Sequence, residues 1–152
     1  NNGGRDAQYF MVNNEYSVSD GSRKAFIDKL DADLQKFESE YHYLFDTIYR
    51  YQSDGTIANA YKMPNIARKV LDNFLMFRIP SSESTYKRLK RLDFDNQKKS
   101  AIYKFVNDQS HITGSGFDPA LVPEAQKNIG YLLELMQTTF PEHYSILEES
   151  LS

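Results

Sequence analysis

Between residues 64 and 77 the chain reads Pro-Asn-Ile-Ala-Arg-Lys-Val-Leu-Asp-Asn-Phe-Leu-Met-Phe. A proline suits the first turn of a helix, and Arg78-Ile79-Pro80 ends the segment. Apolar side chains then fall on almost every side of the predicted helix, at Ile66, Ala67, Val70, Leu71, Phe74, Leu75 and Phe77. Such a helix must be covered by neighbours, so it belongs in the middle of a bundle. The segment therefore predicts an all-α fold with this helix at its centre.

Other helical patterns surround this central segment. A long helix is predicted from about Ser22 to Tyr51, with Asp20 or Ser22 as its cap and Ser53-Asp54-Gly55 as its stop. Its apolar stripe is expected to lie in the core and comprises Phe26, Leu30, Leu34, Phe37, Tyr41, Leu44, Phe45 and Ile48. Further helices are expected over residues 84–92, 96–108, 118–139 and after residue 140, the third of them capped by Asp118 with Pro119 at its first position. The pattern predicts a helical bundle of about five to six helices.

The N-terminal residues have a different pattern. Residues 8–18 favour β-structure and are interrupted by Asn13-Asn14, a pair that tolerates the turn of a short β-hairpin. An isolated hairpin is marginal in water, so it is expected to pack on the helices or to continue a sheet from upstream sequence. The chain also begins without methionine, on Asn1-Asn2-Gly3-Gly4. We expect a piece of a longer polypeptide, with residues 1–19 as a hairpin remnant and residues 20–152 as a helical domain.

Composition excludes several classes of protein. The 152 residues, 40% of them hydrophobic and 26% charged, suffice for one folded domain with a core. The absence of cysteine excludes disulfides and thiolate metal sites and is compatible with a cytoplasmic location. No apolar run approaches the ~18 residues that a membrane span needs. The sequence contains no phosphate-binding loop, and His42, His111 and His143 lack the spacing of a helical metal pair, so no cofactor or metal is expected within these residues.

A basic stretch lies within the acidic chain. The formal net charge is −3, yet residues 87–104 carry seven cationic side chains against Asp93 and Asp95. Such a stretch indicates an anionic partner such as nucleic acid, whose phosphates attract clustered cations. The alternative is a solvated, lysine-rich helix face. The candidate nucleic-acid-binding residues are Lys87, Arg88, Lys90, Arg91, Lys98, Lys99 and Lys104.

Four segments, in order and spacing, resemble one family. They are residues 40–45 (Glu-Tyr-His-Tyr-Leu-Phe), residues 63–77 with Pro80, residues 102–111 (Ile-Tyr-Lys-Phe-Val-Asn-Asp-Gln-Ser-His) and residues 140–144 (Phe-Pro-Glu-His-Tyr). From about Gln8 to Glu149 the chain resembles the C-terminal region of bacterial ABC-type AAA ATPases related to the wobble-nucleotide-excising anticodon nucleases. The resemblance implies an upstream ATPase head in the same polypeptide, without which there is no ATPase activity, and a role like that of restriction-linked and phage-defence effectors.

The resemblance also implies a candidate catalytic site. An Arg-x-x-x-acid pattern followed later by Asn-x-x-Ser-His is similar to HEPN-type helical domains, in which such residues form a metal-independent ribonuclease centre. The corresponding residues are Arg68, Asp72 and His111. This chain departs from the pattern in two ways: Asp72 stands where glutamate is usual, and no arginine precedes His111 at the spacing of the Arg-x4-6-His form, the nearest upstream cation being Lys104.

The chemistry of these three side chains fits RNA cleavage. A base must take the 2′-hydroxyl proton, a cation must stabilise the phosphorane, and an acid must protonate the leaving oxygen. Histidine suits proton transfer near neutral pH, and arginine binds phosphate oxygens. The structural alternative is an ordinary i,i+4 ion pair between Arg68 and Asp72, with His111 hydrogen-bonded at a helix end.

Three functions therefore remain open. The first is an effector or assembly domain of a defence-type ATPase, directed at RNA such as tRNA. The second is an HEPN-like ribonuclease in its own right. The third is a non-catalytic homodimerisation or partner-binding bundle, in which the 11 Tyr and 10 Phe supply contact surface. If Arg68 and His111 act together, the helices that carry them must be adjacent.

Overall fold

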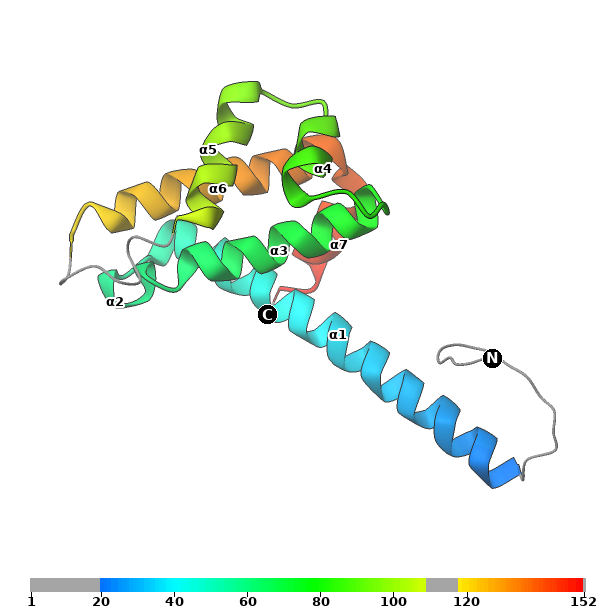
Figure 1. Cartoon of the computed structure of the whole chain (residues 1–152). Helices are drawn as coiled ribbons and strands as arrows, with labels where there is room; N and C mark the ends of the chain where they lie inside the picture. Colours follow the sequence, from blue (N-terminus) through cyan, green and yellow to red (C-terminus); the bar gives the residue numbers. More distant parts are fainter. Residues whose placement is uncertain (1–19, 109–117, 152) are drawn as a thin grey trace. The chain divides into compact units, whose positions relative to one another are not determined.

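The protein is all-helical in the part of the chain that a computed structural model describes, residues 20–108 and 118–151. Those residues contain seven helices and no strand (Figure 1): α1 (Asp20–Asp54), α2 (Ile57–Ala60), α3 (Met63–Arg78), α4 (Thr85–Arg91), α5 (Asn96–Asn107), α6 (Leu121–Thr139) and α7 (Pro141–Glu149). The predicted all-α bundle is confirmed, with one helix more than the five to six predicted, because the four-residue α2 is too short to show a period. The predicted hairpin over residues 8–18 lies outside the described residues.

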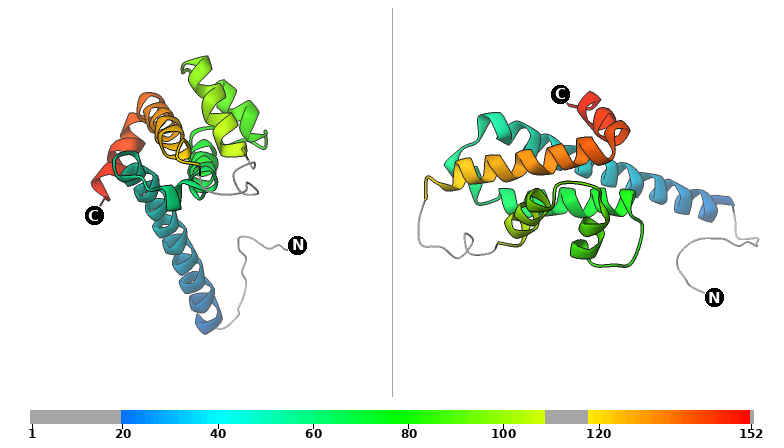
Figure 2. Two further views of the ribbon diagram at one scale, coloured as in Figure 1. Left: turned by 90° about the vertical axis from the view of Figure 1, so that its left-hand side faces the viewer. Right: turned by 90° about the horizontal axis from the view of Figure 1, so that it is seen from above.

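The chain divides into two units, residues 1–39 and residues 40–152, and α1 contributes residues to both. In the second unit α3 is central, because it contacts α2, α4, α5 and α6. Helix α6 runs beside α3 and also contacts α5 and α7 (Figure 2). The central position predicted for the segment 64–77 is therefore confirmed.

The core of the second unit is built from the predicted apolar faces. Burying a large apolar side chain stabilises a fold by about 1.5–3 kcal/mol, so the twelve largest fully buried side chains dominate the packing. Phe77 was also expected to face inward, but it is exposed at the C-terminal end of α3. The reason is its position at the edge of the bundle, where its ring contacts Tyr41 and His143. The fully buried side chains are Phe45, Ile48, Met63, Leu71, Phe74, Leu75, Leu89, Ile102, Ile129, Leu132, Leu135 and Met136.

The stripe along α1 is only partly core. In residues 40–54 the predicted Tyr41, Leu44, Phe45 and Ile48 are buried. In residues 20–39 the prediction is wrong, because Phe26, Leu30 and Leu34 are exposed. A helical period identifies a shared face but does not supply a neighbour to cover it.

Local hydrogen bonds determine where the helices begin. Ser84 and Asp95 cap α4 and α5 as acceptors from the backbone N–H three residues ahead. Helix α6 begins at Leu121 and not at the predicted Pro119. Asp118 Oδ1 accepts from the N–H of Ala120 at 3.0 Å, and the carbonyl of Asp118 accepts from the N–H of Leu121, so a turn occupies these positions.

No helix among the described residues combines the length and the apolar character that crossing a membrane would require.

Candidate functional site

Arg68 connects α3 to the end of α5. Its Nη1 donates a hydrogen bond to Oδ1 of Asn107 at 2.6 Å, and Nδ2 of Asn107 donates to the carbonyl of Tyr103 at 2.8 Å. Because Asn107 is the last residue of α5, its amide is held between its own helix and α3. The guanidinium group is thereby positioned where α5 ends.

Asp72 is held on the other side of the same guanidinium group. Its Oδ2 lies 3.6 Å from Nε of Arg68, and its Oδ1 accepts a hydrogen bond from Oγ1 of Thr85 at 2.8 Å. Thr85 is the first residue of α4, so the network joins α3, α4 and α5. The side chains of Arg68 and Asp72 are 41% and 40% exposed, which makes the pair accessible from solvent and of little value for stability.

His111 lies outside the described residues and follows Asn107, the last residue of α5, by four positions in the sequence. Helix α5 packs against α3, which carries Arg68. Whether the imidazole meets Arg68 stays a prediction.

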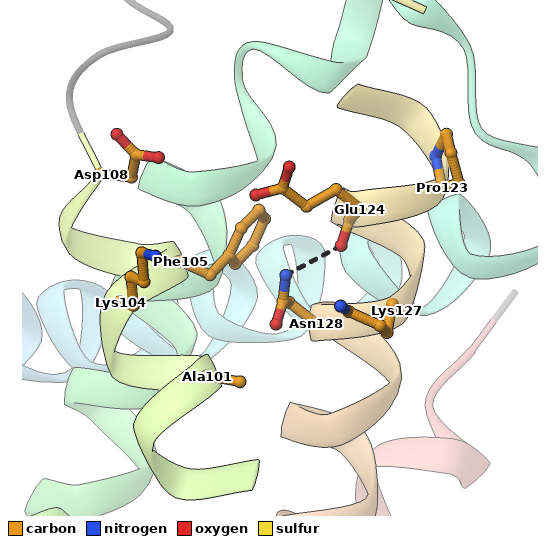
Figure 3. A pocket seen from close by; sticks show the side chains of 8 residues that line it. All are labelled: Ala101, Lys104, Phe105, Asp108, Pro123, Glu124, Lys127 and Asn128. Atoms are coloured by element: carbon orange, nitrogen blue, oxygen red, sulfur yellow. Dashed lines mark hydrogen bonds between the residues drawn. The ribbon is translucent and has the colours of Figure 1, made fainter. Parts of the chain in front are cut away.

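A cleft of about 530 Å³ lies between α5 and α6, next to the end of α5 (Figure 3). It contains side chains of both charges, with Lys104 and Asp108 on the α5 side and Glu124 and Lys127 on the α6 side. Asn128 at its base donates from Nδ2 to the carbonyl of Glu124 at 2.9 Å. The remaining lining residues are Ala101, Phe105 and Pro123. The balanced charge means that the cleft does not by itself favour an anion.

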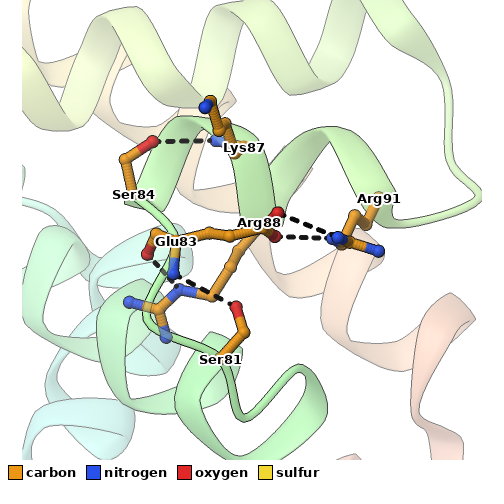
Figure 4. A network of polar contacts seen from close by, with 6 residues as sticks. All are labelled: Ser81, Glu83, Ser84, Lys87, Arg88 and Arg91. Carbon is orange, nitrogen blue, oxygen red and sulfur yellow. Dashed lines mark hydrogen bonds and ion pairs between the residues drawn. The ribbon is translucent and has the colours of Figure 1, made fainter.

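Part of the basic stretch is neutralised by Glu83, which precedes it in the sequence. Arg91 donates to Glu83 through Nε at 2.6 Å and through Nη2 at 2.8 Å (Figure 4). This bidentate hydrogen bond lowers the pKa of the Glu83 carboxyl. Arg88 donates from Nε to the carbonyl of Glu83 at 3.1 Å, so both arginines are engaged with one residue.

Three of the lysines also have partners within the fold. Lys98 donates to both carboxylate oxygens of Glu134 at 3.0 Å, and this contact raises the pKa of Lys98. Lys99 is buried and donates from Nζ to the carbonyl of Leu92 at 2.7 Å, at the C-terminal end of α4. The ammonium group of Lys90 lies 5.0 Å from the centre of the Tyr86 ring.

Lys87 and Lys104 differ from the other candidates. Both are exposed, and among the described residues neither ammonium group makes an ion pair, a hydrogen bond or, unlike Lys90, a contact with an aromatic ring. Of the seven predicted nucleic-acid-binding residues, these two have the side chains most available to an external phosphate.

A family model described as "AAA domain" matches the chain over residues 1–134. The chain belongs to this AAA domain family. The match covers the Arg68 network and the basic stretch as well as most of α6. The predicted relationship to AAA ATPases is thereby confirmed at the level of the family. No curated protein and no solved structure matches the chain.

The AAA-family chain also contains an aromatic cluster that sequence analysis did not predict. The hydroxyl of Tyr41 lies 2.8 Å from Nε2 of His143, and the ring of Phe140 stacks on the imidazole with centroids 5.2 Å apart. Phe74 and Phe77 complete the surroundings, each with its ring centre 5.7 Å from that of His143. Burial lowers the pKa of His143, and the charge of His42 lowers it further.

Sequence analysis also missed two polar partners of Arg68 and Asp72. The sequence indicates Asn107 only as the first residue of the Asn-x-x-Ser-His pattern, and no motif or spacing identifies Thr85 as a site residue. In the described ranges 20–108 and 118–151, no three or more His, Asp or Glu side chains gather in a way that could hold a metal ion. The site there consists of one guanidinium group with its carboxylate, amide and hydroxyl partners.

Proposed function

We propose that the helical unit of this AAA-family chain is an RNA-directed effector domain under the control of an ATPase head in the same polypeptide. The observation that supports this proposal is the hydrogen bond from Arg68 to Asn107. It holds a half-exposed guanidinium group at the end of α5, and the candidate proton-transfer residue His111 follows that end by four residues. In the proposal His111 acts beside Arg68, with the imidazole as the base and the guanidinium group as the cation of metal-independent RNA cleavage.

In this proposal each side chain has a separate role. Arg68 now donates to the neutral amide of Asn107, and a phosphate oxygen would accept a stronger, charge-assisted hydrogen bond from the same guanidinium group. Asp72, fixed by Thr85, would hold Nε of Arg68 in place while Nη1 turns to the phosphate. His111 would take the proton of the 2′-hydroxyl, whose oxygen then attacks phosphorus to form a 2′,3′-cyclic phosphate. The 5′-oxygen of the next nucleotide is displaced and leaves as a hydroxyl after taking a proton from water.

The match to the AAA domain family is the reason for including an upstream ATPase head in the proposal. An AAA-type ATPase couples nucleotide binding to changes of conformation, and an effector in the same polypeptide would be held inactive until the head changes state. The biological setting would be defence, with tRNA as the RNA. The effector role, the substrate and the trigger are all parts of the proposal.

The direct test measures cleavage of a structured RNA by the chain in the presence of EDTA. We expect cleavage to disappear in Arg68→Ala and His111→Ala and to persist in Lys69→Ala, which removes a neighbouring exposed cation from α3. The thermal midpoint of Arg68→Ala should fall by only about 2–4 °C, because its ion pair with Asp72 is weak and its hydrogen bond to Asn107 contributes about 1 kcal/mol. Cleavage that survives both substitutions would refute the ribonuclease assignment.

A binding measurement separates RNA recognition from catalysis. RNA with 2′-O-methyl groups lacks the attacking hydroxyl, so it reports binding even when the effector is inactive. Weaker binding by Arg68→Ala, but not by Lys69→Ala, would support an RNA site at the end of α5. Equal binding by both variants would favour the alternative, in which Arg68, Asp72, Asn107 and Thr85 form a structural joint between three helices in a partner-binding bundle.

A further inference from the structure

The first half of α1, residues 20–39, exposes an apolar stripe (blue in Figure 1). Ile27, Leu30 and Leu34 follow one another at steps of three and four, and their exposed fractions are 50%, 47% and 55%. Phe26, beside them, is 57% exposed. Steps of three and four are the a and d positions of a coiled-coil heptad, whose side chains pack into the holes of a facing helix. We call Ile27, Leu30 and Leu34 the α1 seam.

The charges beside the α1 seam are mostly acidic. With Ile27 and Leu34 at a and Leu30 at d, three of the e and g positions that flank the seam hold the exposed acidic residues Asp31, Asp33 and Glu38, and the only cation at such a position in this segment is Lys24. Of the three lysines of this segment, Lys24 is at an e position, whereas Lys29 and Lys36 fall at c positions, further from the seam. Lys29 reaches Asp33 at 3.2 Å, but both side chains are more than half exposed, so this pair is weak and can exchange its partner.

These flanks do not favour a second copy of the same helix. In a parallel pair in register, the g position of one helix faces the next e position of the other, which places Asp33 opposite Glu38 on both sides. In an antiparallel pair centred between Leu30 and Leu34, Asp31 faces Asp31 and Asp33 faces Asp33. Lys24 of each helix then meets Glu38 of the other, so two attractive contacts offset the two repulsive ones. The flanking charges therefore select against the parallel pair and give the antiparallel pair no net attraction.

We propose that the α1 seam is a docking surface for a helix of a different sequence, with an apolar a/d seam flanked by lysine or arginine. Basic residues on that helix would face Asp31, Asp33 and Glu38, while its apolar residues would cover Ile27, Leu30 and Leu34. This surface goes beyond the proposed RNA site, because it uses none of the residues of that site and has the opposite charge preference.

The test uses synthetic peptides of about three heptads, the usual minimum for a stable coiled coil. One peptide has leucine and isoleucine at a and d and lysine at e and g, and the second is identical except for glutamate at e and g. Each is titrated against the full chain and followed by fluorescence anisotropy at low ionic strength, where surface charges are least screened. Sedimentation velocity on the chain alone gives its oligomeric state.

Matched variants separate the seam from its charges. Leu30→Ser with Leu34→Ser should weaken binding of the lysine peptide by at least about tenfold, since two apolar side chains lose their burial. Ala32→Ser with Gln35→Ser changes positions away from the seam and should bind like the unmodified chain. Asp31→Asn with Asp33→Asn should reduce the preference for lysine over glutamate by about threefold or more, whereas Asp28→Asn should not.

The outcomes divide clearly. Tight binding of the lysine peptide, weak binding of the glutamate peptide and sensitivity to the seam substitutions support the proposal. Equal binding of both peptides, no binding, or unchanged binding by Leu30→Ser with Leu34→Ser overturns it, as does a dimer of the chain that these substitutions dissolve. Circular dichroism checks that the variants keep their helix. If Leu30→Ser with Leu34→Ser loses helix, the test rests on the comparison of Asp31→Asn with Asp33→Asn against Asp28→Asn.

Discussion

The hydroxyl of Tyr41 lies 2.8 Å from Nε2 of His143, so α1 and α7 are joined by a hydrogen bond between residues 102 positions apart. Tyr41 is buried and His143 is half-buried among Phe74, Phe77 and Phe140. An imidazole in such surroundings is more stable neutral, because charging it would cost solvation that the aromatic rings do not replace. The contact that joins α1 to α7 therefore depends on the protonation state of His143.

Stability should decrease as the pH falls below neutral. Burial lowers the pKa of His143 in the folded chain below its ordinary value of 6.5, so near and below that pH the unfolded chain binds more protons than the folded chain. The free energy of unfolding therefore falls as the pH is lowered from 6.5 toward the folded pKa and levels off below it. Urea denaturation at several pH values above about 5, where carboxyl groups stay ionised, measures the effect.

His143→Gln should remove most of this pH dependence, whereas His42→Gln should keep it, because burial and not the charge of His42 is the larger cause of the shift. An identical pH profile in His143→Gln and the unmodified chain would show that the imidazole is not buried as described.

The hydrogen bond between Arg68 and Asn107 should appear as a coupling energy. In a double-mutant cycle with Arg68→Ala and Asn107→Ala, we expect about 1 kcal/mol, since the bond involves a charged donor but is partly exposed. The parallel cycle for Arg68 and Asp72 should give at most about 0.5 kcal/mol, as for other i,i+4 pairs at a surface. A coupling near zero in the first cycle would mean that α3 and α5 are not joined there in solution.

Lys99 should matter for stability although it was predicted to bind nucleic acid. Lys99→Met keeps the stem but leaves the carbonyl of Leu92, at the end of α4, without its donor. We expect a loss of about 1–2 kcal/mol in the free energy of unfolding. Lys87→Met, which changes an exposed lysine of α4, should stay within about 0.5 kcal/mol of the unmodified chain and serves as the control. Equal stability of the two variants would contradict the capping role.

Binding of RNA, if it uses the basic stretch, should depend on only part of it. Lys87→Gln with Lys104→Gln should flatten the dependence of affinity on salt by about 0.7–0.9 per lost phosphate contact, because these two exposed cations are available for phosphates. Lys98→Gln should change the slope less, since Lys98 is already paired with Glu134. Titrations at two salt concentrations measure both slopes, and a salt-independent affinity would favour the interpretation of this stretch as a solvated helix face.

The sequence predicts the pairs of site residues that share one helix, but not the pairs that come from different helices. Arg68 and Asp72 follow from their spacing, because residues four apart share one face of a helix. Asn107 and Thr85 could not be assigned as their partners, since they come from α5 and α4 and depend on how these helices pack. Counting charges along the sequence likewise overstated the positive charge that the basic stretch offers to a partner, because Glu134, 36 positions away, neutralises Lys98.

By itself, the sequence determined which segments are helical and which of their faces are apolar, and it indicated the family. Periodicity and most caps depend on residues within one or two turns, so α1, α3, α4, α5 and α7 lie where they were predicted. Helix α2 has only four residues and shows no period. Only the tertiary structure decided that Tyr41 is buried beside His143 while Leu30 and Leu34, on the same predicted stripe, are exposed. The physical reason is that burial requires a facing surface, and the packing of distant segments provides that surface.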